Sequence, residues 1–303
     1  SNTPFYFFRT AAGVYLKAGF GDEMDTTSWY HLALVQDGTA DEAYAYQNGV
    51  LKATISNVGE ITVTSTTNAV IGSHWAATAS SFFDGIIDEC AIFNSALSAV
   101  DIRAIYNGGT PRSLDPYSPL AWWRMGDGPL DNGNVAGNGL IGDQVNPTLG
   151  SELVTNGTME VDADWSDLNT PTVNSRKFVT DSNGDGIKSD TFTVTAGKVY
   201  KVTAHLYISA LSGGGNNIQM RLQNGNGADV GGVNQSNTST GGWITETFYI
   251  RATLSGSSSY FKINQAGNGT ATAYLDNVSV KEVNGYPGMM ENMGPEDIVA
   301  DTP

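Results

Sequence analysis

Short runs of alternating apolar and polar residues recur along the whole chain, separated by Gly, Asn, Asp and Ser. A period of two is typical of strands, and the three-to-four-residue spacing of long amphipathic helices is almost absent. In the first third, this pattern predicts strands at residues 30–35, 44–47 and 50–53. Asn48-Gly49 predicts a type I′ hairpin turn between the last two strands, because that turn requires two positive φ angles.

Two further elements stand out in the same third. Residues 85–93 carry apolar side chains on both faces of the predicted strand, with Cys90 near the middle, which predicts a central strand buried on both sides. A short helix is predicted over residues 99–106, since Ser98 can cap its start, Asp101 stands three residues later and Gly108 can end it. We expect this helix to dock on the sheet.

Beyond residue 110 the chain becomes rich in Pro, Gly, Asn and Asp around Trp122-Trp123, and a second strand-rich pattern then begins. Its spacing predicts a second β-sandwich. The predicted organisation is all-β: two β-sandwich (jelly-roll) domains at residues 1–110 and 152–283, a linker at 111–151 and an acidic, Met-rich tail at 284–303. Strands of the second domain are expected at residues 192–194, 199–208, 218–222, 244–252, 260–263 and 273–283.

The amino-acid composition limits which molecules the protein can bind. The chain has 303 residues, with 31 acidic and 15 basic side chains and a formal net charge of −16, so phosphate backbones and anionic lipid surfaces would repel it. We therefore expect neither nucleic-acid binding nor membrane insertion, and no apolar run reaches the length of a membrane span. Cys90 is the single cysteine, which excludes an internal disulfide.

Several segments of the first region carry a family resemblance: residues 29–38, the hairpin at 46–51, and a block from 83–89 through 94–98 to 105–109. In this order they resemble a laminin G-like domain of the concanavalin A-like jelly-roll family. That family normally places several strands before the segment that starts here at Trp29. The resemblance therefore implies a domain truncated at its start, or a fragment of a longer polypeptide.

The second region resembles a galactose-binding-like carbohydrate-binding module, on residues 156–160 with Trp165, 195–200, 242–244 and 274–280. Two other segments, residues 122–128 and 290–299, are similar to structural proteins of marine tailed bacteriophages. These resemblances imply glycan binding and a place on a virion.

Catalytic chemistry finds little support in the sequence. His31, His74 and His205 lie in unrelated places, and none accompanies a nucleophile motif. Asp88 and Glu89 are adjacent, so they would point to opposite faces of a strand and could not flank one glycosidic bond. We predict a non-enzymatic protein.

Calcium is the metal that the oxygen-rich ligand supply favours. The loop that begins at residue 181 offers Asp181, Asn183 and Asp185 at positions 1, 3 and 5, but Phe192 at position 12 excludes an EF-hand. A turn stabilised by Asx side chains and a looser calcium site remain open as alternatives. The module resemblance separately implies a structural calcium ion held by Glu160 and Asp276.

Sugar binding would need exposed aromatic rings, because pyranose faces stack on them. The candidates are Trp165, Tyr207, Trp243 and Tyr260. Trp165, which is flanked by acidic residues, is the one we expect to be exposed, whereas the pattern around Trp243 favours a packing residue.

Other side chains are candidates for contacts between subunits. Of Trp122 and Trp123, one is expected to fill a sandwich and the other an interface. Met289 and Met290 are expected to dock the tail against a neighbouring subunit.

Taken together, these features predict a non-enzymatic structural or adhesion protein on the virion surface, such as a tail fibre, head fibre or capsid decoration protein. It would form homo-oligomers, contact other virion subunits and bind cell-surface or environmental glycans. The alternative is a secreted bacterial carbohydrate-binding protein or adhesin.

Overall fold

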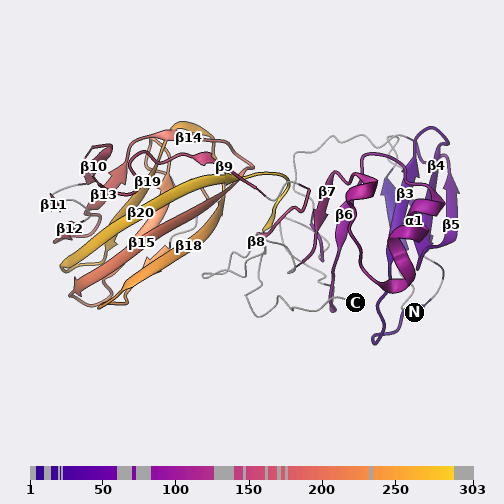
Figure 1. Cartoon of the computed structure of the whole chain (residues 1–303), viewed down its shortest axis with the longest axis horizontal. Coiled ribbons are helices and arrows are strands. Elements are labelled where there is room, and N and C mark those ends of the chain that lie inside the picture. The colour runs from indigo at the N-terminus through magenta and orange to yellow at the C-terminus, as the bar shows by residue number, and fades with distance from the viewer. Residues whose placement is uncertain are drawn as a thin grey trace. The chain divides into compact units, whose positions relative to one another are not determined.

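The computed structural model describes residues 5–9, 15–19, 21, 23–59, 70–72, 83–125, 140–145, 148–160, 163–168, 172–174, 177–231 and 235–289. They form two compact units, one ending at Met125 and one beginning at Gly126 (Figure 1). Strands dominate both units, as the all-β prediction requires. Within these ranges, no helix is long and apolar enough to cross a membrane. His74, Met290 and the tail beyond it lie outside the described residues.

The first unit contains three groups of antiparallel strands. β3, β4 and β5 form one sheet in that order, while β1 pairs with β2 and β6 pairs with β7. The elements are β1 (Phe5–Arg9), β2 (Tyr15–Gly19), β3 (Leu32–Asp37), β4 (Glu42–Gln47), β5 (Val50–Ser56), β6 (Cys90–Ile92), α1 (Ala99–Tyr106), the 3₁₀ turns η1 (Asn107–Gly109) and η2 (Asp115–Tyr117), and β7 (Ala121–Trp123).

Local signals in the first unit produce the structure that they predict. Asn48 and Gly49 both have positive φ, 51° and 73°, as a type I′ turn between β4 and β5 requires. The helix α1 covers the predicted residues and starts with a capping box in which Ser98 and Asp101 exchange hydrogen bonds. It ends one residue before the predicted Gly108, at Asn107 in the left-handed conformation.

The prediction of a long, doubly buried strand at residues 85–93 is wrong. Only Cys90–Ile92 form a strand, which pairs with β7, and the side chains of Ile86 and Ile92 are 58% and 46% exposed. Glu89 has a φ of 52°, which ends the extended backbone just before β6. Apolar residues on both faces of this segment therefore did not mean that its side chains are buried.

The second unit is a β-sandwich of two six-stranded sheets. The β20 sheet has the order β11-β12-β20-β15-β18, with β9 also on β20, and the β19 sheet has the order β10-β13-β19-β16-β17, with β14 also on β19. The strands are β9 (Leu149–Glu152), β10 (Trp165–Leu168), β11 (Thr172–Asn174), β12 (Lys177–Thr180), β13 (Gly186–Ser189), β14 (Phe192–Val194), β15 (Val199–Leu211), β16 (Asn217–Gln223), β17 (Gln235–Asn237), β18 (Trp243–Arg251), β19 (Gly256–Ala266) and β20 (Ala271–Val283).

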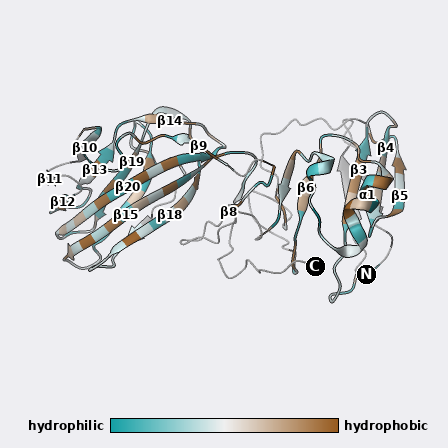
Figure 2. Ribbon diagram, viewed as in Figure 1, coloured by the Kyte–Doolittle hydropathy of each residue, from teal (hydrophilic) through white to brown (hydrophobic). Residues whose placement is uncertain are grey.

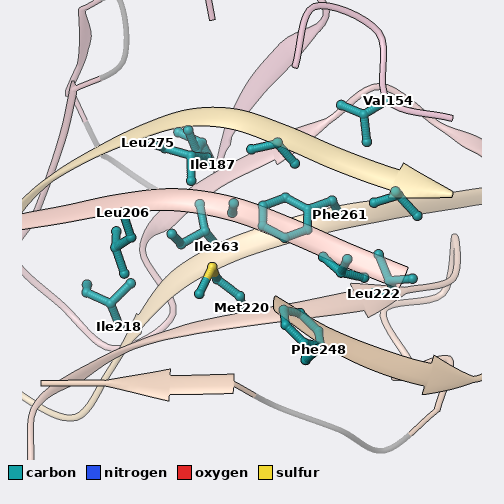
Figure 3. Packing of buried hydrophobic residues seen from close by; sticks show 14 of the residues in the cluster. Val154, Ile187, Leu206, Ile218, Met220, Leu222, Phe248, Phe261, Ile263 and Leu275 are labelled. Carbon is teal, nitrogen blue, oxygen red and sulfur yellow. The ribbon is translucent and has the colours of Figure 1, made fainter. Parts of the chain in front are cut away.

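The inner faces of the two sheets share one hydrophobic core (Figure 3). Along β15 and β20, buried apolar residues alternate with half-exposed ones, and Figure 2 shows this banding. Alternation therefore determines which side chains enter the core and which face outward. The largest fully buried side chains in this core include Phe178, Ile187, Leu206, Ile218, Met220, Leu222, Phe248 and Phe261.

Each predicted strand of the second unit is found, and most extend further than predicted. The segment predicted as a linker contributes strands to both units. β7 belongs to the first unit, whereas β9 pairs with β20 in the second. A short strand β8 (Leu140–Ile141) pairs with β21 (Gly288–Met289), so the main chain of Met289 is held within the second unit.

Candidate functional site

The outer face of the β20 sheet carries a row of aromatic side chains. Tyr274 on β20 pairs in register with Tyr207 on β15, which pairs in register with Trp243 on β18. Lys177 on β12 continues the row on the other side of Tyr274. The even-numbered neighbours on β15, Leu206 and Ile208, are fully buried, so Tyr207 points away from the core.

The three rings lie close together with similar orientations. The Tyr207 ring centroid is 5.5 Å from that of Tyr274 and 5.8 Å from that of Trp243, with interplanar angles of 28° and 34°. The ammonium group of Lys177 lies 5.9 Å from the Tyr274 ring centroid. Trp243, at the end of the row, is 54% exposed. We call Lys177, Tyr274, Tyr207 and Trp243 the aromatic row.

Polar groups continue along the same outer face. His205 pairs in register with Asp276, and its Nδ1 lies 3.3 Å from Nδ2 of Asn277. Further along, the strands form a shallow hollow. Its lining consists of Leu149, Lys201, Thr203, Ser279 and Lys281. The face thus combines apolar ring surfaces with hydroxyl, amide and ammonium groups, which is the mixture that sugar-binding surfaces use.

The other two aromatic candidates do not offer free rings. Trp165 is half-buried against the core, its ring lies edge-on to Phe261 at 6.2 Å, and its Nε1 donates to the carbonyl of Asn156 at 3.0 Å. The expectation that Trp165, and not Trp243, is the exposed ring is therefore wrong. Tyr260 is 9% exposed, and Lys188 Nζ lies 4.9 Å from its ring centroid.

The acidic loop at residues 181–186 is a hydrogen-bonded turn. Asp185 is fully buried, and its Oδ2 accepts from the amides of Asp181 and Ser182 and from the Ser182 hydroxyl at 2.8–3.3 Å. Oδ1 of Asn183 accepts from the amide of Gly267 at 3.3 Å. These contacts fit the alternative of a turn stabilised by Asx side chains. A calcium ion held by Asp181, Asn183 and Asp185 stays a prediction.

The second calcium candidate joins two segments of the same sheet. The Val278 amide donates to the Gly157 carbonyl at 2.8 Å, which ties the segment that carries Glu160 to the strand that carries Asp276. Among the described residues, no three His, Cys, Asp or Glu side chains are grouped so that they could hold a metal. A calcium ion here would need backbone or water oxygens besides these carboxylates, and its binding stays a prediction.

Three side chains of the first unit that could take part in catalysis are partly buried or held by hydrogen bonds. Glu89 accepts from Trp122 Nε1 at 2.6 Å and from Arg124 Nε at 3.0 Å. Burial, with the nearby charges of Asp88 and Glu89, raises the pKa of Cys90 to about 11, so its thiol stays protonated at neutral pH. Burial also lowers the pKa of His31, whose ring centroid lies 6.0 Å from that of Tyr106.

The two linker tryptophans have different environments. Trp122 is buried in the first unit, and Arg124 stands over its ring at 5.8 Å, whereas Trp123 is half-buried. An intersubunit contact for Trp123 or Met289 stays a prediction.

Sequence comparison finds a family model that matches most of the first unit. Residues 1–103 match the model of a laminin G-type family in the concanavalin A-like lectin/glucanases superfamily. This match supports the jelly-roll prediction for the first unit and covers about a third of the chain. Among curated proteins, none matches the chain.

Solved structures show weak similarity to less than half of the chain. A CBM4 module shares 12% identity over 39% of this chain and 94% of its own, with a TM-score of 0.33. The xylan-binding module CBM15 shares 13% over 44% and 96%, with a TM-score of 0.34. An arabinose-bound MgGH51 α-L-arabinofuranosidase shares 16% over 45% of this chain, with a TM-score of 0.37, and the match spans only 27% of that enzyme.

Two members of the aromatic row, Tyr274 and Lys177, were not among the sequence candidates. Tyr274 precedes Leu275, which is fully buried, so strand alternation could have placed it on the outer face. Its position beside Tyr207 depends on the pairing of β15 with β20, and no local pattern specifies that register.

Proposed function

We propose that the second unit binds glycans through the aromatic row, without catalysing their breakdown. The observation that carries the proposal is the in-register placement of Tyr274, Tyr207 and Trp243 on a solvent-facing sheet. The exposed half of the Trp243 ring contributes nothing to core packing. A sugar ring that stacked there would bury that surface.

The polar surroundings of the row fit the same kind of ligand. Sugar hydroxyls need both donors and acceptors, and His205, Asp276 and Asn277 lie within a few residues of the rings along the same strands. The jelly-roll match of the first unit is to a superfamily of lectins and glucanases, which is compatible with a carbohydrate-related protein.

Binding without hydrolysis is part of the proposal. The carboxylate pair considered for glycosidase chemistry, Asp88 and Glu89, lies in the first unit, and Glu89 is occupied by Trp122 and Arg124. Because Glu89 orients an indole and a guanidinium group, this pair does not provide a free acid and base across one bond.

The biological setting follows from the resemblance of residues 122–128 and 290–299 to phage structural proteins, so we propose display on a virion surface. A secreted bacterial protein is the alternative. Portal and capsid genes beside this one would support the first setting, whereas glycoside hydrolase genes would support the second. Repeated copies on a particle would strengthen a weak glycan contact.

Affinity electrophoresis of the full chain in gels with xylan, laminarin or hydroxyethyl cellulose tests the binding. We expect at least one polysaccharide to retard the protein. Trp243→Ala should weaken that binding about tenfold, because one ring-stacking contact contributes on the order of 1 kcal/mol. The matched control is Trp29→Ala, since Trp29 is 43% exposed but lies in the first unit. If Trp243→Ala and Trp29→Ala are retarded equally, the proposal is contradicted. It is also contradicted if no polysaccharide retards the wild-type chain.

A further inference from the structure

A row of three basic side chains crosses the outer face of the β19 sheet. Lys262 on β19 pairs in register with Lys188 on β13 and with Arg221 on β16. Side chains at such positions are about 5 Å apart at Cβ, and like charges there are unfavourable. Three of the 15 basic residues in a chain of net charge −16 thus stand side by side.

Outward side chains next to this row are nearly buried. Tyr260, Asn264 and Gln223 point away from the core, yet they are only 9%, 4% and 6% exposed. Their chain neighbours Phe261 and Ile263 occupy the core on the opposite face. The Arg221 side chain is 16% exposed. The basic groups therefore lie where water screens their charges poorly.

Carboxylates neutralise only part of the positive charge of this row. Asp229 lies 3.6 Å from Arg221 Nη1 and also accepts from Gln223 Nε2 at 2.9 Å. In the described part of the chain, neither Lys188 nor Lys262 has a carboxylate within ion-pair distance. Burial, followed by the neighbouring charge of Arg221, lowers the pKa of Lys262. Three cations therefore share one carboxylate.

Hydrogen-bonding capacity on the same face is also unused. Nε of Arg221 and Oδ1 of Asn264 are buried without a hydrogen-bond partner. Asn264 is two residues from Lys262 on the same face of β19, and its Nδ2 is already committed to the carbonyl of Gln265 at 2.7 Å. Buried polar atoms are normally paired, so a missing donor and a missing acceptor beside unpaired cations point to a ligand.

We propose that the outer face of the β19 sheet binds an anionic sugar residue, whose carboxylate or sulfate oxygens accept from Lys262 and Arg221 and whose hydroxyl donates to Asn264. The carbohydrate nature of the carrier rests on the proposed function, whereas the negative charge follows from the basic row. Charge-assisted hydrogen bonds to guanidinium and ammonium groups recognise both kinds of oxyanion. A nucleic acid is the disfavoured occupant, because its extended charge would meet the acidic remainder of the chain.

Isothermal titration of the full chain at 0.15 M salt tests the inference with three probes: oligogalacturonate for carboxylates, sulfated dextran for sulfates, and neutral dextran as the parent of the latter. We expect at least one acidic probe to bind at least tenfold more tightly than dextran. Lys262→Gln should weaken that binding about tenfold, whereas Lys262→Arg should retain it. Lys52→Gln is the matched control, since Lys52 lies on β5 of the first unit, outside both proposed binding faces.

The outcomes separate this inference from the proposed function. Equal losses in Lys262→Gln and Lys52→Gln would show non-specific attraction and overturn the inference. An oligonucleotide titrated in the same way that bound more tightly than either acidic glycan would also overturn it. Loss of neutral-glycan binding in Trp243→Ala, with no acidic probe bound by the wild type, would leave the aromatic row standing and remove the anionic site. If neither neutral nor acidic glycans bind, both proposals fail.

Discussion

The two outer faces of the second unit carry different kinds of side chain on one sandwich. On the β20 sheet, the outward positions of neighbouring strands carry Tyr274, Tyr207 and Trp243, with Trp243 more than half exposed. On the β19 sheet, the equivalent outward positions carry Lys188, Lys262 and Arg221. One face presents aromatic rings, and the other presents cations.

The difference shows that the fold and the chemistry of this unit depend on alternate residues of the same strands. Inward positions of both sheets are mostly apolar and form one core, with polar exceptions such as Glu246 and Gln265. Outward positions are free to vary, because a change there leaves the core packing intact. Each outer face can therefore have a binding chemistry of its own.

The largest expected effect tests this separation of inner and outer positions. Phe261→Ala removes a fully buried ring from the core and should lower the free energy of unfolding of the second unit by about 3–5 kcal/mol. Trp243→Ala should lower it by less than about 1 kcal/mol, because its ring is half in solvent. Urea denaturation followed by circular dichroism measures both. Similar losses would mean that the aromatic row is part of the core.

The sequence predicted the inner half of this architecture well and the outer half poorly. Alternation around Leu206, Ile208 and Phe248 identified the strands, because burial imposes a local period of two. Trp165 was expected to be exposed from its acidic neighbours along the chain, although the face of the strand determines exposure. Trp243 stands one residue before Ile244, which packs on the core, so its parity already indicated the outer face.

Both cross-strand rows were beyond sequence reasoning for a different reason. Lys188, Lys262 and Arg221 are separated by dozens of residues and become neighbours only through the pairing of β13, β19 and β16. Register is fixed by the whole core and by turn geometry. The four-residue strands β10, β12 and β13 were also missed, because segments this short show too few alternations to stand out.

The next largest effect concerns the predicted calcium site at Glu160 and Asp276. If Glu160 and Asp276 hold calcium, the ion at about a hundredfold its Kd should stabilise the fold by about 2.7 kcal/mol, and a chelator should remove this gain. Asp276→Asn should abolish the response, measured as a calcium-dependent rise in Tm. Asp115→Asn, in the first unit, is the control and should keep it. A Tm that does not change with calcium would refute the prediction.

The smallest effect concerns the charge of the β19 face in the absence of ligand. Lys262→Met removes a partly buried ammonium group that stands between Lys188 and Arg221, and should raise the free energy of unfolding by on the order of 0.5 kcal/mol at pH 7. The folded-state pKa of Lys262 is lowered from 10.5, mainly by burial. The folded protein therefore binds fewer protons than the unfolded chain just below pH 10.5, and wild-type stability should rise with pH there.

The advantage of Lys262→Met over wild type should accordingly be greatest near neutral pH and shrink as the pH approaches 10.5. Urea denaturation at pH 7, 8, 9 and 10 measures this difference. Lys201→Met controls for the loss of one positive charge from a chain of net charge −16. If Lys262→Met is less stable than wild type at pH 7 while Lys201→Met is not, the Lys262 ammonium is stabilised by its surroundings. The basic row would then be a structural feature of the free protein, with no unmet demand for an anion.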